Sequence, residues 1–469
     1  MRGREQGAAR ALIAAIALTA ISASASAQTL EQAITAAYVN NPTLNAQRAA
    51  VRAADENVPR ALSGYRPTVT GAASAARTAL TTTTEPTTIL GTPVPSTKSN
   101  AILNQSTLSL TLNQNLYNGF RTGNNVRAAE AQVRQSQETL RSTEQQVLLD
   151  AVTAHMNVLR DEALVQLQQQ NVTALGEQLR SAKDRFEVGE VTRTDTALAE
   201  AASAGGRASL IAAQSNLNTS RAVYRQVVGA EAGKLSPGRP IDQMLPRSYD
   251  LAIADGLQRH PAVVSAQYAV DYAALQVKVA EGALLPSVNA QGILQRANEP
   301  NTQLKRQDEA SIGLNATAPI YQGGSEYAAV RQAKEVLGQT RIQMDVTRDQ
   351  VRSQIVQFWS QLEAARSSIQ AAQTQVNAQQ IALKGVTEEY RVGQRTISDV
   401  LTSQANLVQA QSTLVNAQRD RVVASYAVLG SIGRLDMGSL GLQVATYDPE
   451  EHYRQVRDSW IGLRTPDGR

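Results

Sequence analysis

The sequence predicts a mainly α-helical fold in which long coiled-coil-like helical hairpins are joined to a membrane β part of four strands per chain. Three observations predict it: an internal twofold repeat, apolar residues that recur every seven positions, and four alternating stretches of roughly ten residues that fit a bilayer. The chain has 469 residues, 42% hydrophobic but only 4% aromatic, so bulky residues for a thick globular core are scarce. Long thin helices are therefore favoured over a compact enzyme body.

The first residues have the layout of a secretory signal. A basic start at 1–10 precedes an apolar run at 11–21, and small residues follow at Ala25 and Ala27. This pattern predicts a signal peptide over residues 1–27. The apolar run is short for a membrane-spanning helix, and a retained membrane anchor stays open as the alternative.

After this segment, the sequence contains an internal twofold repeat. The matches are NNPTLNAQ from Asn40 with RHPAVVSAQ from Arg259, and LYNG from Leu116 with IYQG from Ile320. We therefore divide the mature chain into a first structural repeat at 28–240, a second at 241–435 and a C-terminal tail at 436–469. A Thr/Pro-rich insert at 81–98 interrupts the first repeat, and its composition predicts an exposed loop.

Each repeat contains a predicted strand pair. In STLSLTLN, which begins at Ser106, leucine alternates with hydroxyl residues, and the second repeat alternates similarly from Ile312. The pairs are expected at 66–80 with 106–118 and at 286–297 with 310–321. From this pattern alone, membrane-spanning strands and small hairpins on a soluble domain are equally open. Tyr117 and Tyr321, at the strand exits, fit either a membrane-interface belt or plain packing.

Heptad spacing predicts a very long helix in each repeat, at 119–188 and 323–392. The seven-residue spacing of apolar residues is interrupted once by a four-residue step, a stutter that straightens a coiled coil. At the rise of an α-helix, each helix should be on the order of 100 Å long. A glycine of each V-G turn then ends the helix, and returning helices are expected at 195–228 and 399–432. Half-length helices are expected near 30–64 and 251–283, where apolar residues also recur every seven positions. The first long helix has its heptad positions at Val126, Val133, Leu140, Val147, Ala154, Val158, Val165, Val172, Leu179 and Phe186.

Four strands cannot close a barrel, and open sheet edges are not tolerated in lipid. If the strands span a membrane, several identical chains must pool them into one barrel, and the attached helices must form a hollow cylinder beneath it. Small and uncharged polar residues dominate the remaining helix faces, as in LQQQN from Leu167. Such residues permit close helix packing and can line a wet lumen.

These features resemble the TolC family of trimeric outer-membrane export channels. The resemblance covers about Leu30 to Leu435 and rests on the repeat, the strand exits LYNG and IYQGG, and above all YRVGQRTISDVL from Tyr390. It implies a homotrimer with a shared 12-stranded barrel in outer-membrane lipid and a long periplasmic α-barrel tunnel. It also implies a periplasmic adaptor (membrane fusion protein) and an inner-membrane ABC or proton-driven transporter as partners, which together export type I secreted proteins or small toxic molecules.

In that family, polar links between neighbouring helices hold the periplasmic tip shut. The resemblance implies that Tyr390 and Arg395 reach towards Thr194 and Asp195 as gate links. A solvated surface charge is the simpler reading of Arg395, because exposed ion pairs contribute little.

The resemblance also implies that Asp399 stands in a ring of carboxylates that constricts the pore. Many relatives carry a second aspartate three residues later, where this chain has Thr402, so the ring should bind cations less strongly. Helix capping is the simpler explanation of both aspartates, since Thr192-x-x-Asp195 and Thr396-x-x-Asp399 fit capping boxes.

The two turns are expected to dock the adaptor. Val188 with Gly189, and Val392 with Gly393, place an apolar side chain at each tip, and exposed apolar sites often serve as docking surfaces.

Catalysis has little support in the sequence. The three histidines lack ligand spacing, there is no cysteine, and neither a nucleophile elbow nor a phosphate-binding loop is present, so we expect no enzyme activity, metal or cofactor. A dispersed net charge of +4 argues against nucleic acid. Two alternatives to an export channel remain. A secreted or surface coiled-coil structural or adhesive protein is the first, but it would not need four bilayer-length strands. A periplasmic adaptor is the second, but it would carry one helical hairpin and a lipid-attachment cysteine or anchor.

Overall fold

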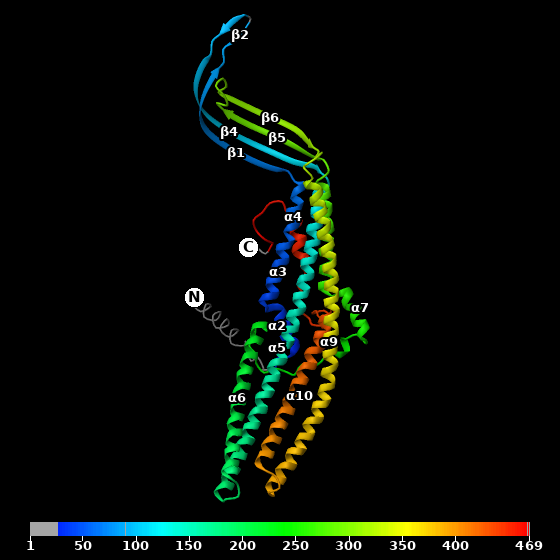
Figure 1. Ribbon diagram of the computed structural model, residues 1–469. Coiled ribbons are helices and arrows are strands. Elements are labelled where there is room, and N and C mark those ends of the chain that lie inside the picture. The colour runs from blue at the N-terminus through cyan, green and yellow to red at the C-terminus, as the bar shows by residue number, and fades with distance from the viewer. Residues whose placement is uncertain (1–26, 90, 467, 469) are drawn as a thin grey trace, which may run out of the picture. The chain divides into compact units, whose positions relative to one another are not determined.

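The computed structural model describes residues 27–89, 91–466 and 468, so the predicted signal peptide lies outside the described residues except for Ala27. Helices dominate, and six strands form two sheets in this part of the chain (Figure 1). None of the helices in the described ranges is long and apolar enough to cross a membrane. Two compact units are present, and each takes equivalent parts of both repeats, so the predicted boundary between 240 and 241 separates the repeats in sequence but not in packing.

Unit 1 comprises Met1–Gln47, Leu140–Val263 and Arg348–Tyr447, and its described residues are mainly helical. Its buried side chains include the inward heptad positions Leu140, Val147, Val158, Val351, Leu362 and Val376. The two long helices are each unbroken over 67 residues and contribute their C-terminal parts. The helices of this unit are α2 (Leu30–Asn40), α5 (Arg121–Glu187), α6 (Arg193–Val228), α7 (Tyr249–Arg259), α9 (Ser325–Arg391) and α10 (Ile397–Ser431).

Unit 2 comprises Arg48–Thr139, Val264–Thr347 and Asp448–Arg469. It contains the N-terminal parts of the long helices and a four-stranded antiparallel sheet in the order β1-β4-β5-β6. The strands are β1 (Thr68–Thr84), β4 (Thr97–Asn118), β5 (Ser287–Asn298) and β6 (Arg306–Thr317), with a separate hairpin of β2 (Thr87–Ile89) and β3 (Thr92–Val94). The helices include α3 (Pro42–Asp55), α4 (Asn57–Leu62), α8 (Pro261–Gly282) and α11 (Pro449–Val456).

Two strand predictions require correction. The insert at 81–98, expected to be a loop, is largely strand, because its β-branched threonines suit a pleated sheet and Thr81 to Thr84 pair with Asn100 to Thr97. The strand expected at 310–321 ends at Thr317, and Pro319 follows, which cannot donate a ladder hydrogen bond.

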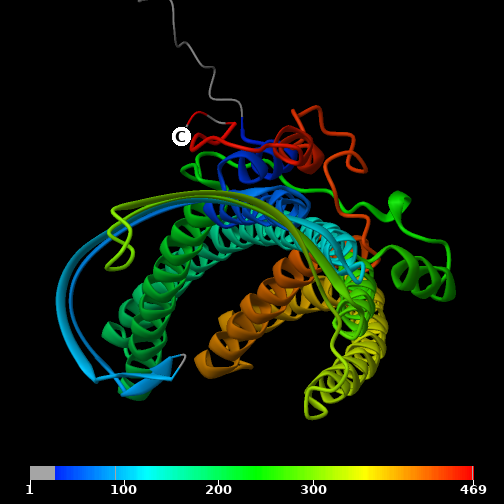
Figure 2. The same cartoon turned by 90° about the horizontal axis from the view of Figure 1, so that it is seen from above.

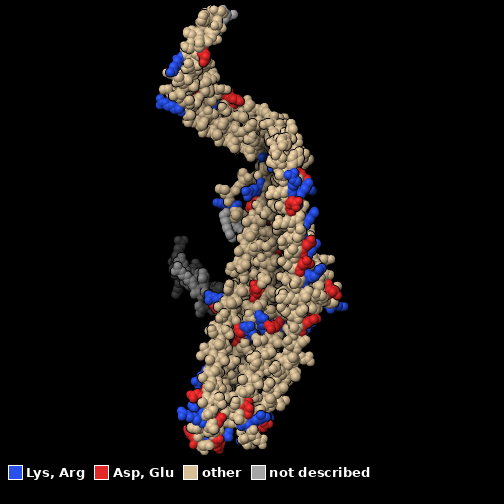
Figure 3. All heavy atoms as spheres, viewed as in Figure 1, with Lys and Arg blue, Asp and Glu red and all other residues tan. Residues whose placement is uncertain are grey.

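The sheet has one apolar and one polar face. Leu110 lies opposite Gly71 and Leu294, and directly opposite residues share a face. One residue further along the strand, Thr111 lies opposite Thr70 on the other face. Exposed apolar side chains on the first face are Val69, Leu108, Leu110, Leu112, Leu294, Ile312 and Leu314. The strands curve together in Figure 2, and few charged side chains appear on the sheet in Figure 3.

A proline divides the predicted half-length helix in each repeat. The first stops at Asn41 and resumes at Pro42, and the second stops at His260 and resumes at Pro261. Proline suits the first position of a helix, and the preceding side chain caps it. Asn41 Oδ1 and His260 Nδ1 each accept the backbone N–H two residues ahead, at 2.9 and 3.2 Å.

The His260 cap makes unit 1 sensitive to acid. Burial lowers the pKa of His260 to about 4, against about 6.5 in an unfolded chain. The unfolded state therefore binds more protons between these values. The stability linked to the neutral ring is complete above about pH 6.5 and is lost as the pH falls towards 4, a loss of about 3 kcal/mol.

We expect His260→Asn, which copies Asn41 of the first repeat, to remove much of this acid sensitivity. The measurement is thermal unfolding in detergent at pH 7 and pH 4.5, followed by circular dichroism. The reciprocal variant Asn41→His should add acid sensitivity. An unchanged difference between the two pH values in His260→Asn would contradict the assignment.

Candidate functional site

The two hairpin turns of unit 1 share one backbone geometry. Gly189 and Gly393 both have φ of 81°, a left-handed conformation that favours glycine. Each donates its N–H to the residue three positions back, at 3.0 and 3.1 Å, and the next N–H reaches five positions back, at 2.9 and 2.8 Å. This bonding is the Schellman motif, which satisfies the last carbonyls of α5 and α9.

Each returning helix begins with a complete capping box. Asp195 Oδ2 accepts the N–H and hydroxyl of Thr192 at 2.9 and 2.7 Å, and Asp399 Oδ2 accepts those of Thr396 at 3.0 and 2.9 Å. Helices α6 and α10 therefore begin at Arg193 and Ile397, two residues before the predicted starts, because each aspartate is the third helical residue. The backbone and side-chain hydrogen bonds from Thr396 lower the pKa of Asp399, so its carboxylate is ionised at neutral pH.

The charged residues beside the turns pair locally. Arg395 Nε lies 2.8 Å from Glu389 Oε2, and Arg185 Nε lies 3.0 Å from Glu190 Oε2. Hydrogen bonds from Tyr390 or Arg395 to Thr194 or Asp195 are absent among the described residues of this single chain. The expected gate links therefore remain a prediction about the assembled state.

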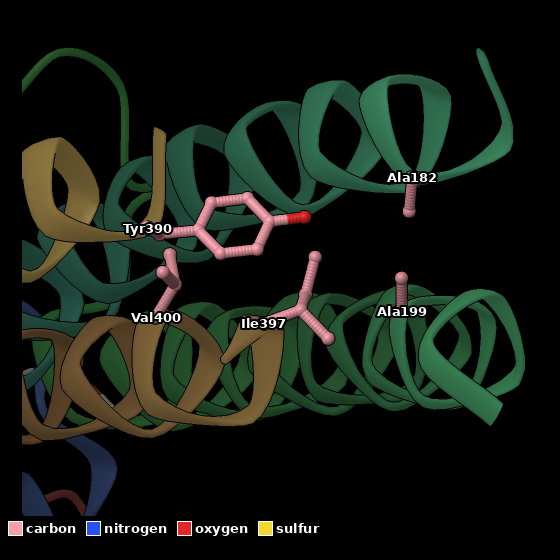
Figure 4. Packing of buried hydrophobic residues seen from close by; sticks show 5 residues of the cluster. All are labelled: Ala182, Ala199, Tyr390, Ile397 and Val400. Carbon is pink, nitrogen blue, oxygen red and sulfur yellow. The ribbon is translucent and has the colours of Figure 1, made fainter. Parts of the chain in front are cut away.

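Tyr390 is a buried contact between the two hairpins of unit 1. Its ring lies against Ile397 and Val400 of α10, and its hydroxyl points towards the side occupied by Ala182 of α5 and Ala199 of α6 (Figure 4). Within the described part of the chain, no group meets the geometric criteria for a hydrogen bond to this hydroxyl. The guanidinium of Arg185 lies 4.8 Å from the ring centroid, a cation–π contact.

Three residues of this contact, Ala182, Ala199 and Arg185, were not predicted from the sequence. The signal lies in comparing the repeats: where the first hairpin has Ala182, the second has the larger Val386. The equivalent of Tyr390 is Phe186, which is 44% exposed. The two hairpins are therefore alike in backbone and different in surface.

The tips of the turns are apolar within a charged surround. Val188 and Val392 are each 71% exposed, and charged side chains of both signs gather at the turn end of unit 1 in Figure 3. Gly189 and Gly393 have open space where a Cβ would lie, so the tips present backbone as well as valine. Across the described ranges, His, Asp and Glu side chains form no group able to hold a metal ion.

The family model described as "Outer membrane efflux protein" matches residues 33–230 and 252–434. The chain belongs to the outer membrane efflux protein family. Both matched segments contain a V-G turn and its capping box, so the two turns lie within the family's shared architecture.

Two curated relatives extend the family assignment. This efflux-family chain is 44% identical over 470 residues to outer membrane efflux protein BepC of Brucella suis biovar 1, covering 99% of this chain and 98% of the relative. It is 26% identical over 364 residues to alkaline protease secretion protein AprF of Pseudomonas aeruginosa, covering 75% and 74%. Among solved structures, the CmeC outer membrane channel of Campylobacter jejuni matches with a TM-score of 0.73 at 18% identity, covering 91% of this chain and 88% of that one.

These findings confirm the predicted fold class, a mainly helical tunnel protein with a β-barrel part. The chain is an outer membrane protein of an efflux channel family whose members are channels rather than enzymes.

Proposed function

We propose that three copies of this chain form a channel-tunnel that exports substrates across the outer membrane from an inner-membrane transporter and a periplasmic adaptor. The observation that carries the proposal is the incomplete sheet of unit 2. Its outer strands β1 and β6 each have a neighbour on one side only, and its apolar face is exposed. Lipid does not tolerate unpaired strand edges, so the sheet must be completed by further copies.

Three copies are favoured over two. Membrane barrels of this kind need at least eight strands in an even number, which two or three copies of four strands would satisfy. The resemblance to trimeric export channels supports a 12-stranded closure with the long helices as a tunnel. In that assembly the exposed Phe186 face of the first hairpin would meet the second hairpin of a neighbouring copy, as Ala182 meets Tyr390 within the chain.

The turns supply the entrance in this proposal. Val188, Gly189, Val392 and Gly393 would dock the adaptor, because their apolar tips are exposed. Asp399, ionised at neutral pH, would give a ring of three carboxylates at the pore. The names of the relatives support both efflux and protein secretion as the export route. The family resemblance adds an inner-membrane ABC or proton-driven transporter as the energy source of the proposed complex.

Disulfide trapping tests the closure, since the chain has no cysteine of its own. Ala73→Cys on β1 is combined in turn with Ala310→Cys, Ile312→Cys and Leu314→Cys on β6, all on the apolar face, so that one of the three pairs matches the register between copies. We expect oxidised outer membranes to give a covalent ladder that ends at three copies. The pair Leu110→Cys and Leu294→Cys, opposite each other within one chain, is the internal control and should add no mass. A ladder that ends at two copies, or none with any pair, would refute the trimer.

If Tyr390 and Arg395 hold the tip of the channel shut, breaking their links should change its conductance. Tyr390→Phe keeps the buried ring and removes only the hydroxyl, and Arg395→Gln removes the charge, so the double variant should raise single-channel conductance several-fold without loosening the hairpins. Arg391→Gln, which breaks the neighbouring pair with Glu388, is the charge-matched control and should leave conductance unchanged. Equal conductance in all three proteins, measured in planar bilayers, would remove Tyr390 and Arg395 from the gate.

A further inference from the structure

The C-terminal tail is fastened to the helices of unit 2. His452 Nδ1 lies 2.9 Å from Asp55 Oδ2, and both side chains are buried. Tyr453 packs on a buried cluster of Val58, Ala129 and Val133. Helix α11 therefore has a fixed position against α3, α4 and α5, which gives the residues after it a defined starting point.

A second tie holds the segment that follows α11. Arg66 Nη1 donates to the carbonyl of Ser459 at 2.6 Å, and its guanidinium lies 4.6 Å from the ring centroid of Trp460. Arg66 stands two residues before the first residue of β1, at Thr68. The tail is thus held at the end of the sheet where the strands meet the helices.

Starting at Trp460, which takes part in this tie, the tail exposes three large apolar side chains in four residues. Trp460 is 68% exposed, Ile461 95% and Leu463 102%. Scattered exposed apolar residues need no explanation, but a contiguous apolar segment marks an interaction site. Arg464 follows directly, so a basic group borders the segment.

The surroundings indicate a lipid surface as the partner. The apolar face of the sheet begins at this end with Val69, and Tyr65 and Phe120 are exposed at the junctions of strands and helices. Aromatic residues at such a boundary favour the membrane interface, where a ring can bury its body and keep its polar edge wet. Tryptophan beside isoleucine, leucine and arginine has the composition of an interfacial anchor.

We propose that Trp460, Ile461 and Leu463 insert into the periplasmic leaflet of the outer membrane, at the boundary between headgroups and acyl chains, as a peripheral anchor for each subunit. The inference rests on the outer membrane location of the sheet and not on the number of copies or the exported substrate. Failure of the anchor would therefore leave the proposed channel untouched.

The test measures the depth of Trp460 in lipid. The full chain has two tryptophans, so Trp359→Phe leaves Trp460 as the only one. This protein is reconstituted into phospholipid vesicles brominated either close to the headgroup or near the chain end. We expect blue-shifted emission, with quenching about twofold or more stronger from the shallow bromines. Water-like emission without quenching by either lipid would overturn the anchor. Emission that is protected from acrylamide yet unquenched by both lipids would also overturn it, in favour of a neighbouring copy.

A paired variant separates insertion from simple proximity. Ile461→Ser with Leu463→Ser should reduce shallow quenching of Trp460 by roughly half or more, because two large apolar groups no longer favour the bilayer. Ile211→Ser with Ile381→Ser, an exposed apolar pair on helices of unit 1, is the matched control and should leave quenching unchanged. Equal quenching in both paired variants would show that Trp460 is near lipid without being anchored, and would overturn the proposal.

Discussion

Alanine at Gly119 is expected to abolish folding of unit 2, whereas alanine at the equivalent Gly323 should be tolerated. Both glycines lie just before the long helix of their repeat with positive φ, 65° and 68°. A Cβ on Gly119 would overlap the carbonyl oxygen of Gly282 and lie 2.9 Å from the Cβ of Leu285. A Cβ on Gly323 would meet nothing within 4 Å. The first change therefore adds a backbone collision to the strain of positive φ, and the second adds strain alone, about 1 kcal/mol.

The measurement is the amount of folded protein recovered from outer membranes, with thermal unfolding of whatever is recovered. Gly119→Ala should give little or none, and Gly323→Ala should unfold only a few degrees below the original protein. Gly282→Ala approaches the same contact from the other side, since its Cβ would overlap the Gly119 carbonyl, and it should fail in the same way. Similar recovery of Gly119→Ala and Gly323→Ala would show that the strand exit can shift to admit a methyl group.

Local rules account for the parts of the fold that the sequence predicted well. Heptads over ten positions fix which side of a long helix is buried, and Val147, Val158 and Leu362 are indeed buried. The V-G turns with Thr-x-x-Asp caps fix where helices end and restart, because Gly189 and Thr192 satisfy backbone groups within a few residues.

The remaining features depend on contacts between distant residues. The packing of Tyr390 against Ala182 requires a choice among many exposed helix faces, and no local rule makes that choice. The attachment of the tail through His452 and Asp55 joins residues about four hundred positions apart, and the sequence shows no repeat or motif there. Local propensity was decisive at 81–98, where threonines favoured strand over the expected loop. Polar composition alone did not distinguish a solvated loop from a strand that extends beyond the apolar band.

A positive charge on the apolar face of the sheet should disrupt the protein far more than the same charge one residue further along the strand. Leu110 lies mid-strand beside Gly71 and Leu294, whereas Thr111 faces the opposite side. If the apolar face meets lipid, Leu110→Arg costs about 2–4 kcal/mol per chain, because the guanidinium is placed near the middle of the bilayer. Thr111→Arg would face the wet interior of the barrel and should leave unfolding in urea nearly unchanged.

The same two variants should also differ in ion selectivity, measured in planar bilayers, and here Thr111→Arg is the one expected to show the effect. Thr111→Arg adds one positive charge per copy to the inner wall, so the reversal potential in a salt gradient should shift towards anion selectivity. Any Leu110→Arg protein that assembles should keep the original selectivity, because its charge lies outside the pore. Since both variants add the same side chain at adjacent positions, differences in expression or net charge cannot produce this crossed pattern. Stability loss in Thr111→Arg together with a selectivity change in Leu110→Arg would mean that Thr111 faces lipid and Leu110 faces the pore, and a barrel with its apolar face outward would have to be abandoned.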